Sequence, residues 1–139
     1  MKKYLLDTNV VSEVRKRKPH GAVLAWLASL HEDQYYICAA TVGELQKGVE
    51  KTRQQDLQKA AELEKWIEVL CQTSQMIQMD TTCFREWGRL IHRKPDQVLE
   101  DALIAATARV HNLTVATRDE ADFRHFDVDV FNPFKYPRP

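Results

Sequence analysis

The sequence predicts an α/β fold, in which helices cover both faces of a mainly parallel central sheet of four to five strands. Short apolar runs alternate along the chain with longer segments of helical periodicity. Strands that alternate with helices are joined by crossover connections, and these place helices on both faces of a parallel sheet. The chain has 139 residues, 44% of them hydrophobic, without a glycine-rich linker or a repeat. We therefore expect residues 1–139 to form a single domain.

Five apolar runs predict the strands. Each is short, rich in β-branched and aromatic side chains, and bounded by polar or turn-forming residues. They are residues 4–6, 35–39, 76–79, 114–117 and 128–131, and Asn132-Pro133 ends the last one.

Helical periodicity fills the segments between these runs. Val23, Trp26, Leu27 and Leu30 are spaced i, i+3, i+4, i+7, and residues 57–71 continue such a pattern over several turns. Residues 98–110 are apolar nearly all round and rich in alanine. Small side chains allow packing on several sides, so this segment is predicted to be the central helix.

The charge and the cysteine content narrow the class of protein. Lys and Arg number 20, as do Asp and Glu, and the resulting net charge of zero argues against a protein that coats nucleic acid non-specifically. Three cysteines without C-x-x-C spacing suggest neither a disulfide framework nor a zinc site, and they suit a reducing compartment. No apolar run approaches the ~18 residues of a membrane span. We expect a cytoplasmic protein that does not enter a membrane.

Four acidic residues are predicted to gather at one edge of the sheet. In an open parallel sheet, the functional groups lie outside the carboxyl ends of the strands. Asp7 directly follows the first predicted strand, and Asp119 follows the fourth. Glu44 is expected in the first turn of a helix that begins near Thr41, and Asp101 in the first turn of the central helix.

Clustered carboxylates need a compensating cation. Two unit charges ~4 Å apart interact by roughly 4 kcal/mol at an effective dielectric of about 20, so four anions together are poorly tolerated alone. Oxygen ligands without a nearby His or Cys favour Mg²⁺ or Mn²⁺. Such an ion activates water and neutralises a phosphate under attack. Hydrolysis of a phosphodiester therefore fits these residues better than redox or acyl-transfer chemistry.

Three of the four acids also have structural interpretations. Thr41 and Glu44 fit the S/T-x-x-E capping box, in which the glutamate only caps a helix. Asp101 would complement the positive end of the helix dipole, and Asp119 would be the N-cap of a short helix. Asp7 is the exception, because an acid directly after an apolar strand has little structural reason to be there. Singly, three of the acids favour structural roles; together, the four favour a functional site.

Four segments of the chain carry a family resemblance. They are LLDTNVVSE at residues 5–13, ICAATVGEL at 37–45, DALIAATA at 101–108, and TVATRD at 114–119 followed by Asp122-Phe123. In this order they resemble the motifs of PIN-domain toxins of the VapC and FitB type. Residues 128–134 resemble the FitB-like branch in particular. The resemblance spans nearly the whole chain.

The resemblance implies a three-layer α/β/α PIN-like fold and an endoribonuclease that cleaves RNA with Mg²⁺ or Mn²⁺. It also implies a toxin held in check by a co-expressed antitoxin, and a homodimer that is often doubled again in the complex. Position by position, it makes Asp7, Glu44, Asp101 and Asp119 the metal-binding and catalytic acids, although many relatives carry Asn in place of Asp119.

The same resemblance assigns supporting roles. Thr8 and Asn9 would orient Asp7 through hydrogen bonds, and Thr117 would orient a water on the metal. Asp122 would either join the site or cap the last helix. Residues 52–98 carry no motif and are expected to supply a helical clip and the dimer surface.

Two questions stay open at the level of sequence. The basic run RKRK at residues 15–18 would either steer RNA toward the acids or form a solvated helix end. The alternative function is a catalytically silent PIN-like module that binds protein or RNA. A receiver domain would need a second acid beside Asp7 and a lysine in place of Arg118, and a haloacid-dehalogenase-like phosphatase would need an aspartate in place of Asn9.

Overall fold

Within the described residues, five strands form one sheet in which all strand pairs are parallel, which confirms the mainly parallel sheet that the sequence predicts. A computed structural model describes residues 1–137, apart from the side chain of Gln97. The strands stand in the order β3-β2-β1-β4-β5. Their bounds are β1 (Tyr4–Leu6), β2 (Tyr35–Cys38), β3 (Met76–Ile77), β4 (Thr114–Ala116) and β5 (Val130–Phe131). All five predicted strands are present, and four of them are shorter than predicted by one or two residues.

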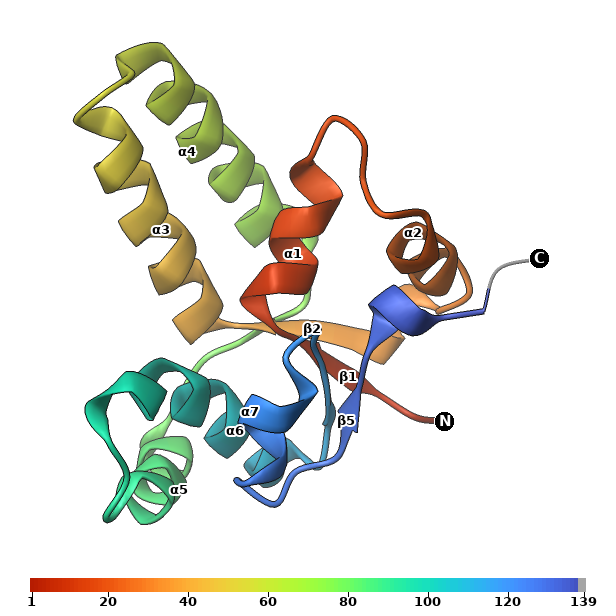
Figure 1. The fold of residues 1–139 in the computed structure, drawn as a ribbon, viewed down its shortest axis with the longest axis vertical. Helices are drawn as coiled ribbons and strands as arrows, with labels where there is room; N and C mark the ends of the chain where they lie inside the picture. Colours follow the sequence, from red (N-terminus) through yellow and green to blue (C-terminus); the bar gives the residue numbers. More distant parts are fainter. Residues whose placement is uncertain (138–139) are drawn as a thin grey trace.

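Helices cover both faces of this sheet (Figure 1). On one side lie α1 (Thr8–Arg15), α2 (Gly21–Ala28), α3 (Ala39–Arg53) and α4 (Leu57–Thr73). On the other side lie α5 (Thr81–Ile91), α6 (Leu99–His111) and α7 (Glu120–Arg124). Short 3-10 turns occupy η1 (Glu32–Gln34), η2 (Asp96–Val98) and η3 (Pro133–Lys135). This is the three-layer α/β/α arrangement that the sequence predicts.

The alternation of side chains along the strands builds two cores. Successive residues of a strand point to opposite faces of the sheet. Leu5 therefore packs with Ala105 of α6 and Phe123 of α7, whereas the next residue, Leu6, packs with Val10 of α1 and Trp26 of α2. Because both faces of a three-residue strand are buried, the strand reads in the sequence as a continuous apolar run.

Helix α6 is the central helix predicted from its composition. Most of its buried side chains are small: Ala102, Ala105, Ala106 and Ala108 are fully buried, together with the larger Ile104. The helix ends at Asn112, whose φ of 55° is the left-handed conformation common after a helix. Its close packing fixes the position of its first turn at the edge of the sheet.

The order of the strands creates a crevice at one place on that edge. The chain leaves β1 toward β2 and β3 on one side, and it returns to β4 and β5 on the other. In such sheets the functional crevice lies outside the carboxyl ends of the strands where the order reverses, here between β1 and β4. The residues that follow these two strands face each other, and the amide of Asp7 donates to the carbonyl of Ala116 at 2.9 Å.

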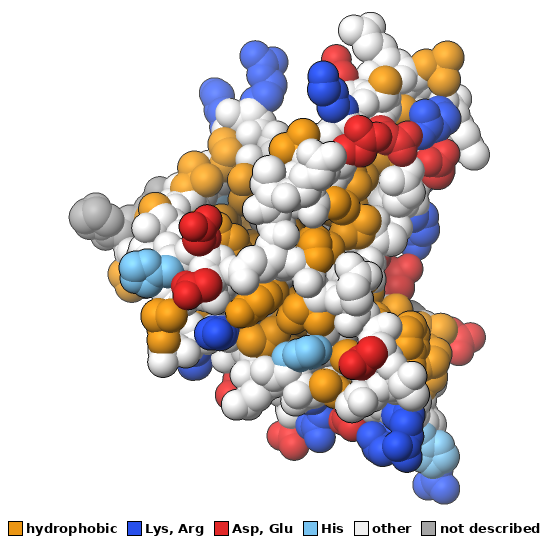
Figure 2. Space-filling model, turned by 180° about the vertical axis from the view of Figure 1, so that it is seen from behind, with side chains coloured by type: hydrophobic (Ala, Val, Ile, Leu, Met, Phe, Trp, Pro, Cys, Tyr) orange, Lys and Arg blue, Asp and Glu red, His pale blue; other side chains and the backbone are white. Residues whose placement is uncertain are grey.

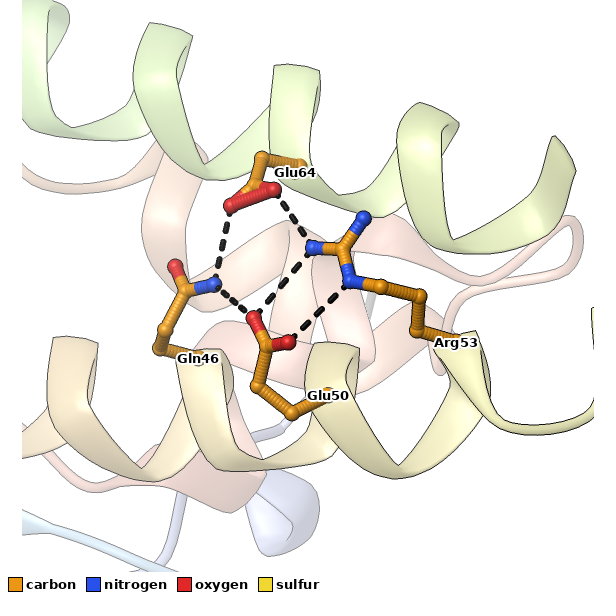
Figure 3. Close-up of polar contacts among 4 residues, drawn as sticks. All are labelled: Gln46, Glu50, Arg53 and Glu64. Atoms are coloured by element: carbon orange, nitrogen blue, oxygen red, sulfur yellow. Dashed lines mark hydrogen bonds and ion pairs between the residues drawn. The ribbon is translucent and has the colours of Figure 1, made fainter. Parts of the chain in front are cut away.

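Helices α3 and α4 form a hairpin that projects from the sheet (Figure 1). Of its two helices, only α4 lies wholly within residues 52–98, the segment expected to supply a helical clip. The hairpin's own small core contains Val49, Ala60 and Ile67. A polar network closes the hairpin on its surface (Figure 3). Gln46 Nε2 donates to Glu50 Oε2 and to Glu64 Oε2, both at 2.8 Å, and Arg53 Nη2 donates to Glu64 Oε1 at 2.7 Å. Arg53 also donates to both carboxylate oxygens of Glu50, at 3.1 and 3.2 Å. Partly exposed pairs of this kind add little stability, and they fix how the two helices align.

Seen from behind, hydrophobic side chains run across the middle of the molecule, and most charged side chains lie toward its margins (Figure 2). The exposed large hydrophobic residues include Leu24 of α2, Leu57 and Val69 of α4, and Phe84 of α5. Within residues 1–137, no helix is long and apolar enough to cross a membrane.

The packing of α6 makes a testable prediction about stability. Ile104 is fully buried against the sheet, so Ile104→Ala should lower the free energy of unfolding by about 2 to 5 kcal/mol. Leu57→Ala removes a similar side chain that is 73% exposed, and it should change this free energy by less than about 0.5 kcal/mol. Urea denaturation followed by circular dichroism measures both. Equal losses in the two variants would contradict the central position of α6.

Candidate functional site

Asp7 directly follows β1 at the place where the strand order reverses, between β1 and β4, and the residue is only 5% exposed. It is the N-cap of α1, and its Oδ1 accepts a hydrogen bond from the amide of Thr8 at 2.8 Å. The expectation that Asp7 has little structural reason to be there is therefore corrected, because a helix begins directly after the strand. Its other oxygen, Oδ2, accepts bonds from the Thr117 hydroxyl at 2.8 Å and from Asn9 Nδ2 at 3.1 Å.

Asn9 and Thr117 hold Asp119 next to Asp7. Asn9 Nδ2 donates to Asp119 Oδ2 at 3.1 Å, and the amide of Asp119 donates to Thr117 Oγ1 at 2.9 Å. Asp119 occupies the N-cap position of α7, yet its side chain makes no capping bond. Its carboxylate is instead directed toward Asn9, the residue that also contacts Asp7.

The structure corrects the placement of Glu44. Helix α3 begins at Ala39, two residues before the predicted start, and its N-cap is Cys38. Alanines are the best helix formers, and the strand before them ends at Cys38. Glu44 therefore lies in the second turn, and the capping box with Thr41 is not formed. Thr41 Oγ1 and Glu44 Oε1 are both buried without a hydrogen-bond partner.

Burial and mutual repulsion raise the pKa values of the acids in this group. Burial raises the pKa of Glu44 to about 7, and Glu100, Asp7 and Asp101 add to the rise, whereas the nearby Thr8 opposes it. The Thr8 hydroxyl itself is buried and completes no hydrogen bond. Burial, followed by repulsion from Asp7 and its neighbours, raises the pKa of Asp101 to about 6. The pKa of Asp7 is raised by burial, while the bonds from Thr117 and Thr8 counteract this rise.

Shared surroundings divide the outer acids into two pairs. Glu44 and Glu100 line the same two surface hollows, and they form the Glu44 end of the acidic group. Asp119 and Asp122 line another hollow together, and they form the Asp119 end, next to Asp7. The charge of Asp7 also raises the pKa of Asp101.

Glu100 is the member of this group to which the sequence assigned no functional role. It lies in the first turn of α6 beside Asp101, and it forms an ion pair of 3.0 Å with Lys47 of α3. Lys47 lies one helical turn after Glu44 on α3. Its ion pair with Glu100 therefore places the first turn of α6 beside Glu44. The exposed Asp122 contributes charge to the group, and no capping bond from its side chain is present among the described residues.

The acids are neighbours, but their side chains do not converge on one position. Within the described part of the chain, no three acidic, histidine or cysteine side chains lie close enough to hold one metal ion as they are placed. The crevice thus brings all four predicted acids within electrostatic range.

The raised pKa values predict how stability depends on pH. The folded chain binds the protons of Glu44 and Asp101 more tightly than the unfolded chain, so the free energy of unfolding in EDTA should fall as the pH rises from about 5 to about 8. Glu44→Gln removes one of these groups and should be more stable than the wild type at pH 8, by on the order of 1 kcal/mol. Urea titrations at pH 5 and pH 8 measure the difference.

The matched control for this prediction is Glu68→Gln, which changes an exposed residue of α4 outside the acidic group. It should follow the wild type at both pH values. If Glu44→Gln also followed the wild type, the mutual repulsion inferred for the crevice would be wrong.

Comparison with known proteins places this geometry in a family. The model of the PIN domain matches residues 4–129. The toxin FitB of Neisseria gonorrhoeae is 36% identical over 137 residues, which cover 94% of this chain and 97% of FitB. The VapC ribonuclease Y4jK of Sinorhizobium fredii is 32% identical, with coverage of 94% and 97%.

A solved structure shows the same similarity in three dimensions. The crystal structure of FitAcB from Neisseria gonorrhoeae superimposes with a TM-score of 0.76 at 35% identity, over 95% of this chain and 99% of that one. Sequence and fold thus agree over nearly the full length. The chain belongs to the PIN-domain family and, within it, to the toxins of the VapC and FitB type.

Proposed function

We propose that this protein is a metal-dependent endoribonuclease, the toxin of a toxin–antitoxin pair, with residues 1–139 acting as a single PIN domain. The observation that carries the proposal is the fixed pair of Asp7 and Asp119, with Glu44 and Asp101 near enough for the charge of Asp7 to raise their pKa values. Similarity to a VapC ribonuclease supports the same activity.

The residues of the crevice fit a divalent cation of the Mg²⁺ or Mn²⁺ kind. All of the candidate ligands are carboxylates, which such hard ions prefer. Glu44 Oε1 and Thr8 Oγ1 are buried polar atoms without a partner, and such atoms are rare unless they serve a ligand. Burial and, after it, repulsion raise the pKa values of Glu44 and Asp101, and a cation would favour the charged form of both. Asp7, Glu44, Asp101 and Asp119 would hold the ion.

When bound, such an ion supplies a water of lowered pKa and neutralises charge on the phosphate. The chain's own residues prepare the site for it. Three hydrogen bonds orient the Asp7 carboxylate. They also favour its charged form against the effect of burial, since a carboxylate that accepts several hydrogen bonds is stabilised as an anion. Asn9 sets the separation of Asp7 and Asp119 by donating to both. Asn9, Thr8 and Thr117 are positioning residues.

We also propose that the chain forms a homodimer and binds an antitoxin protein, and that larger assemblies form with it. The proposal rests on the family, because single exposed hydrophobic side chains such as Leu24, Leu57 and Phe84 are ordinary on a protein surface. The naming of the related FitB as a toxin supports a neutralising partner.

Asp7→Asn should abolish cleavage of RNA. The substitution keeps the shape of the side chain and removes the charge that a cation requires, so we expect a loss of at least about 100-fold in rate. The measurement uses labelled single-stranded RNA with purified, antitoxin-free protein in Mg²⁺, Mn²⁺ or EDTA. Asp33→Asn is the matched control, because Asp33 is exposed and lies in η1, before β2, at the opposite end of the sheet.

The products and the binding of RNA separate this activity from its alternatives. Hydrolysis by water should leave a 5′-phosphate and a 3′-hydroxyl, whereas a 2′,3′-cyclic phosphate would refute the scheme. If the wild type binds RNA and cuts none of a panel of transfer, ribosomal and messenger RNAs, the protein is the silent binding module instead.

Mn²⁺ should stabilise the folded protein through the same acids. A ligand that binds only the folded state raises its stability by about 2.7 kcal/mol at 100 times its Kd. The melting temperature of the wild type should therefore rise with added Mn²⁺, and that of Asp7→Asn should rise much less. Asp33→Asn should behave as the wild type. An equal rise in all three proteins would place the ion elsewhere.

A further inference from the structure

A cavity of about 370 Å³ opens beside one end of the acidic group, between α1, α3 and α4. Glu44 and Glu100 of the acidic group line this cavity, and Arg15 and Trp66 line it as well. A basic side chain is therefore placed at the Glu44 end of the crevice. Because Arg15 and Glu44 line the same cavity, one residue of the basic run lies close to the acidic group.

Arg15 and Lys16 are neighbours in the basic run, and they contact different kinds of partner. Its guanidinium lies over the ring of Trp66, 5.7 Å from the centroid, and no carboxylate of the described residues lies within ion-pair distance of it. Lys16, in contrast, forms an ion pair of 2.9 Å with the buried Glu13. An aromatic face orients a guanidinium and leaves its charge and N–H donors available to an anion.

Arg118 has the same kind of support at the other end of the acidic group. It directly precedes Asp119, and its guanidinium lies 4.9 Å from the ring centroid of Phe134. Its backbone amide donates to Asn9 Oδ1 at 3.3 Å, which ties it to the residue between Asp7 and Asp119. Across residues 1–137 it has no carboxylate partner, whereas the nearby Arg124 is paired with Glu120 at 3.0 Å.

A polyanion that approaches this crevice meets several carboxylates, so its binding requires cations close to them. Lys47 lies near Glu44, and its charge is already paired with Glu100. Arg15 and Arg118 lie over aromatic rings and have no carboxylate partner among residues 1–137, and one of them lies at each end of the acidic group. Arginine also recognises phosphate through two parallel hydrogen bonds.

We propose that Arg15 and Arg118 bind the RNA phosphates on the two sides of the phosphate that is cleaved. The RNA backbone then crosses the acids from the Glu44 end to the Asp119 end, with the cavity beside Trp66 next to the nucleotide at the first end. This inference rests on the proposed function, because it takes RNA as the substrate.

The test measures binding in a background that cannot cleave. Asp7→Asn protein is titrated into a fluorescein-labelled single-stranded RNA of mixed sequence and about 12 nucleotides, and anisotropy is followed between about 50 and 200 mM KCl. Arg15→Gln and Arg118→Gln should each weaken binding about 5- to 10-fold at low salt. Each should also reduce the slope of log K against log salt by about 0.7, the value for one phosphate contact on a single strand.

Matched controls remove the same charge from a neighbouring, ion-paired residue. Lys16→Gln and Arg124→Gln should reduce the slope by less than a third of this amount, and the double variant of Arg15 and Arg118 should lose about 1.4 in slope. Thermal melts verify that each variant is folded. Slopes for Arg15→Gln and Arg118→Gln that equal those of the controls, or no binding of RNA at about 50 mM KCl, would overturn the proposal.

The outcome is independent of whether the wild type cuts the RNA used. Binding that depends on both arginines, without cleavage by the wild type in Mn²⁺, would support the phosphate contacts and reject the nuclease. Cleavage with unchanged binding in the arginine variants would retain the nuclease and reject the contacts.

Discussion

The burial of the Asp7 carboxylate is the constraint on which the rest of the site depends. Burial disfavours its charge, and hydrogen bonds from Thr8, Asn9 and Thr117 favour it. These donors come from the ends of two strands that meet only because β4 lies beside β1. Asn9 and Thr117 also position Asp119, the first by donating to its carboxylate and the second by accepting from its amide. One buried charge thus explains why the residues after β1 and β4 are polar within an otherwise apolar core.

The site departs from what stability alone would favour. The carboxyls of Glu44 and Asp101 both have raised pKa values, because they are partly buried and lie near other acids. One oxygen of Glu44 is also buried without a hydrogen-bond partner. Conflicts of this kind between local chemistry and stability are typical of functional sites. The surrounding structure tolerates them because α6 and the strands around it are packed tightly by small and apolar side chains.

The sequence predicted the features that depend on local pattern and on the rules of parallel sheets. The strand before Asp7, the central helix and the edge at which the acids meet all follow from apolar periodicity and strand–helix alternation. The start of α3 was predicted two residues too late, because Thr41 and Glu44 match a common capping pattern. Only the pairing of β2, which ends at Cys38, shows that the helix begins at Ala39.

Contacts between distant segments could not be predicted from local sequence patterns. Asn9 could be expected to orient Asp7, yet its second bond, to Asp119, spans 110 residues. The difference between Arg15 and Lys16 was also invisible, since it depends on Trp66 of another helix and on the buried Glu13. Side chains of one type in one run acquire different roles only through the tertiary structure.

The distance along the chain between Asp7 and Thr117 has a consequence for synthesis. Their hydrogen bond joins residues 110 positions apart, and β1, in the middle of the sheet, has β4 as one of its two neighbours. A growing or truncated chain that ends before β4 contains three of the acids and lacks both the donor that fixes Asp7 and the neighbour that completes the crevice. Contacts so far apart in sequence slow folding. The complete arrangement around Asp7 therefore requires nearly the entire polypeptide, because Thr117 and the strand before it come late in the chain.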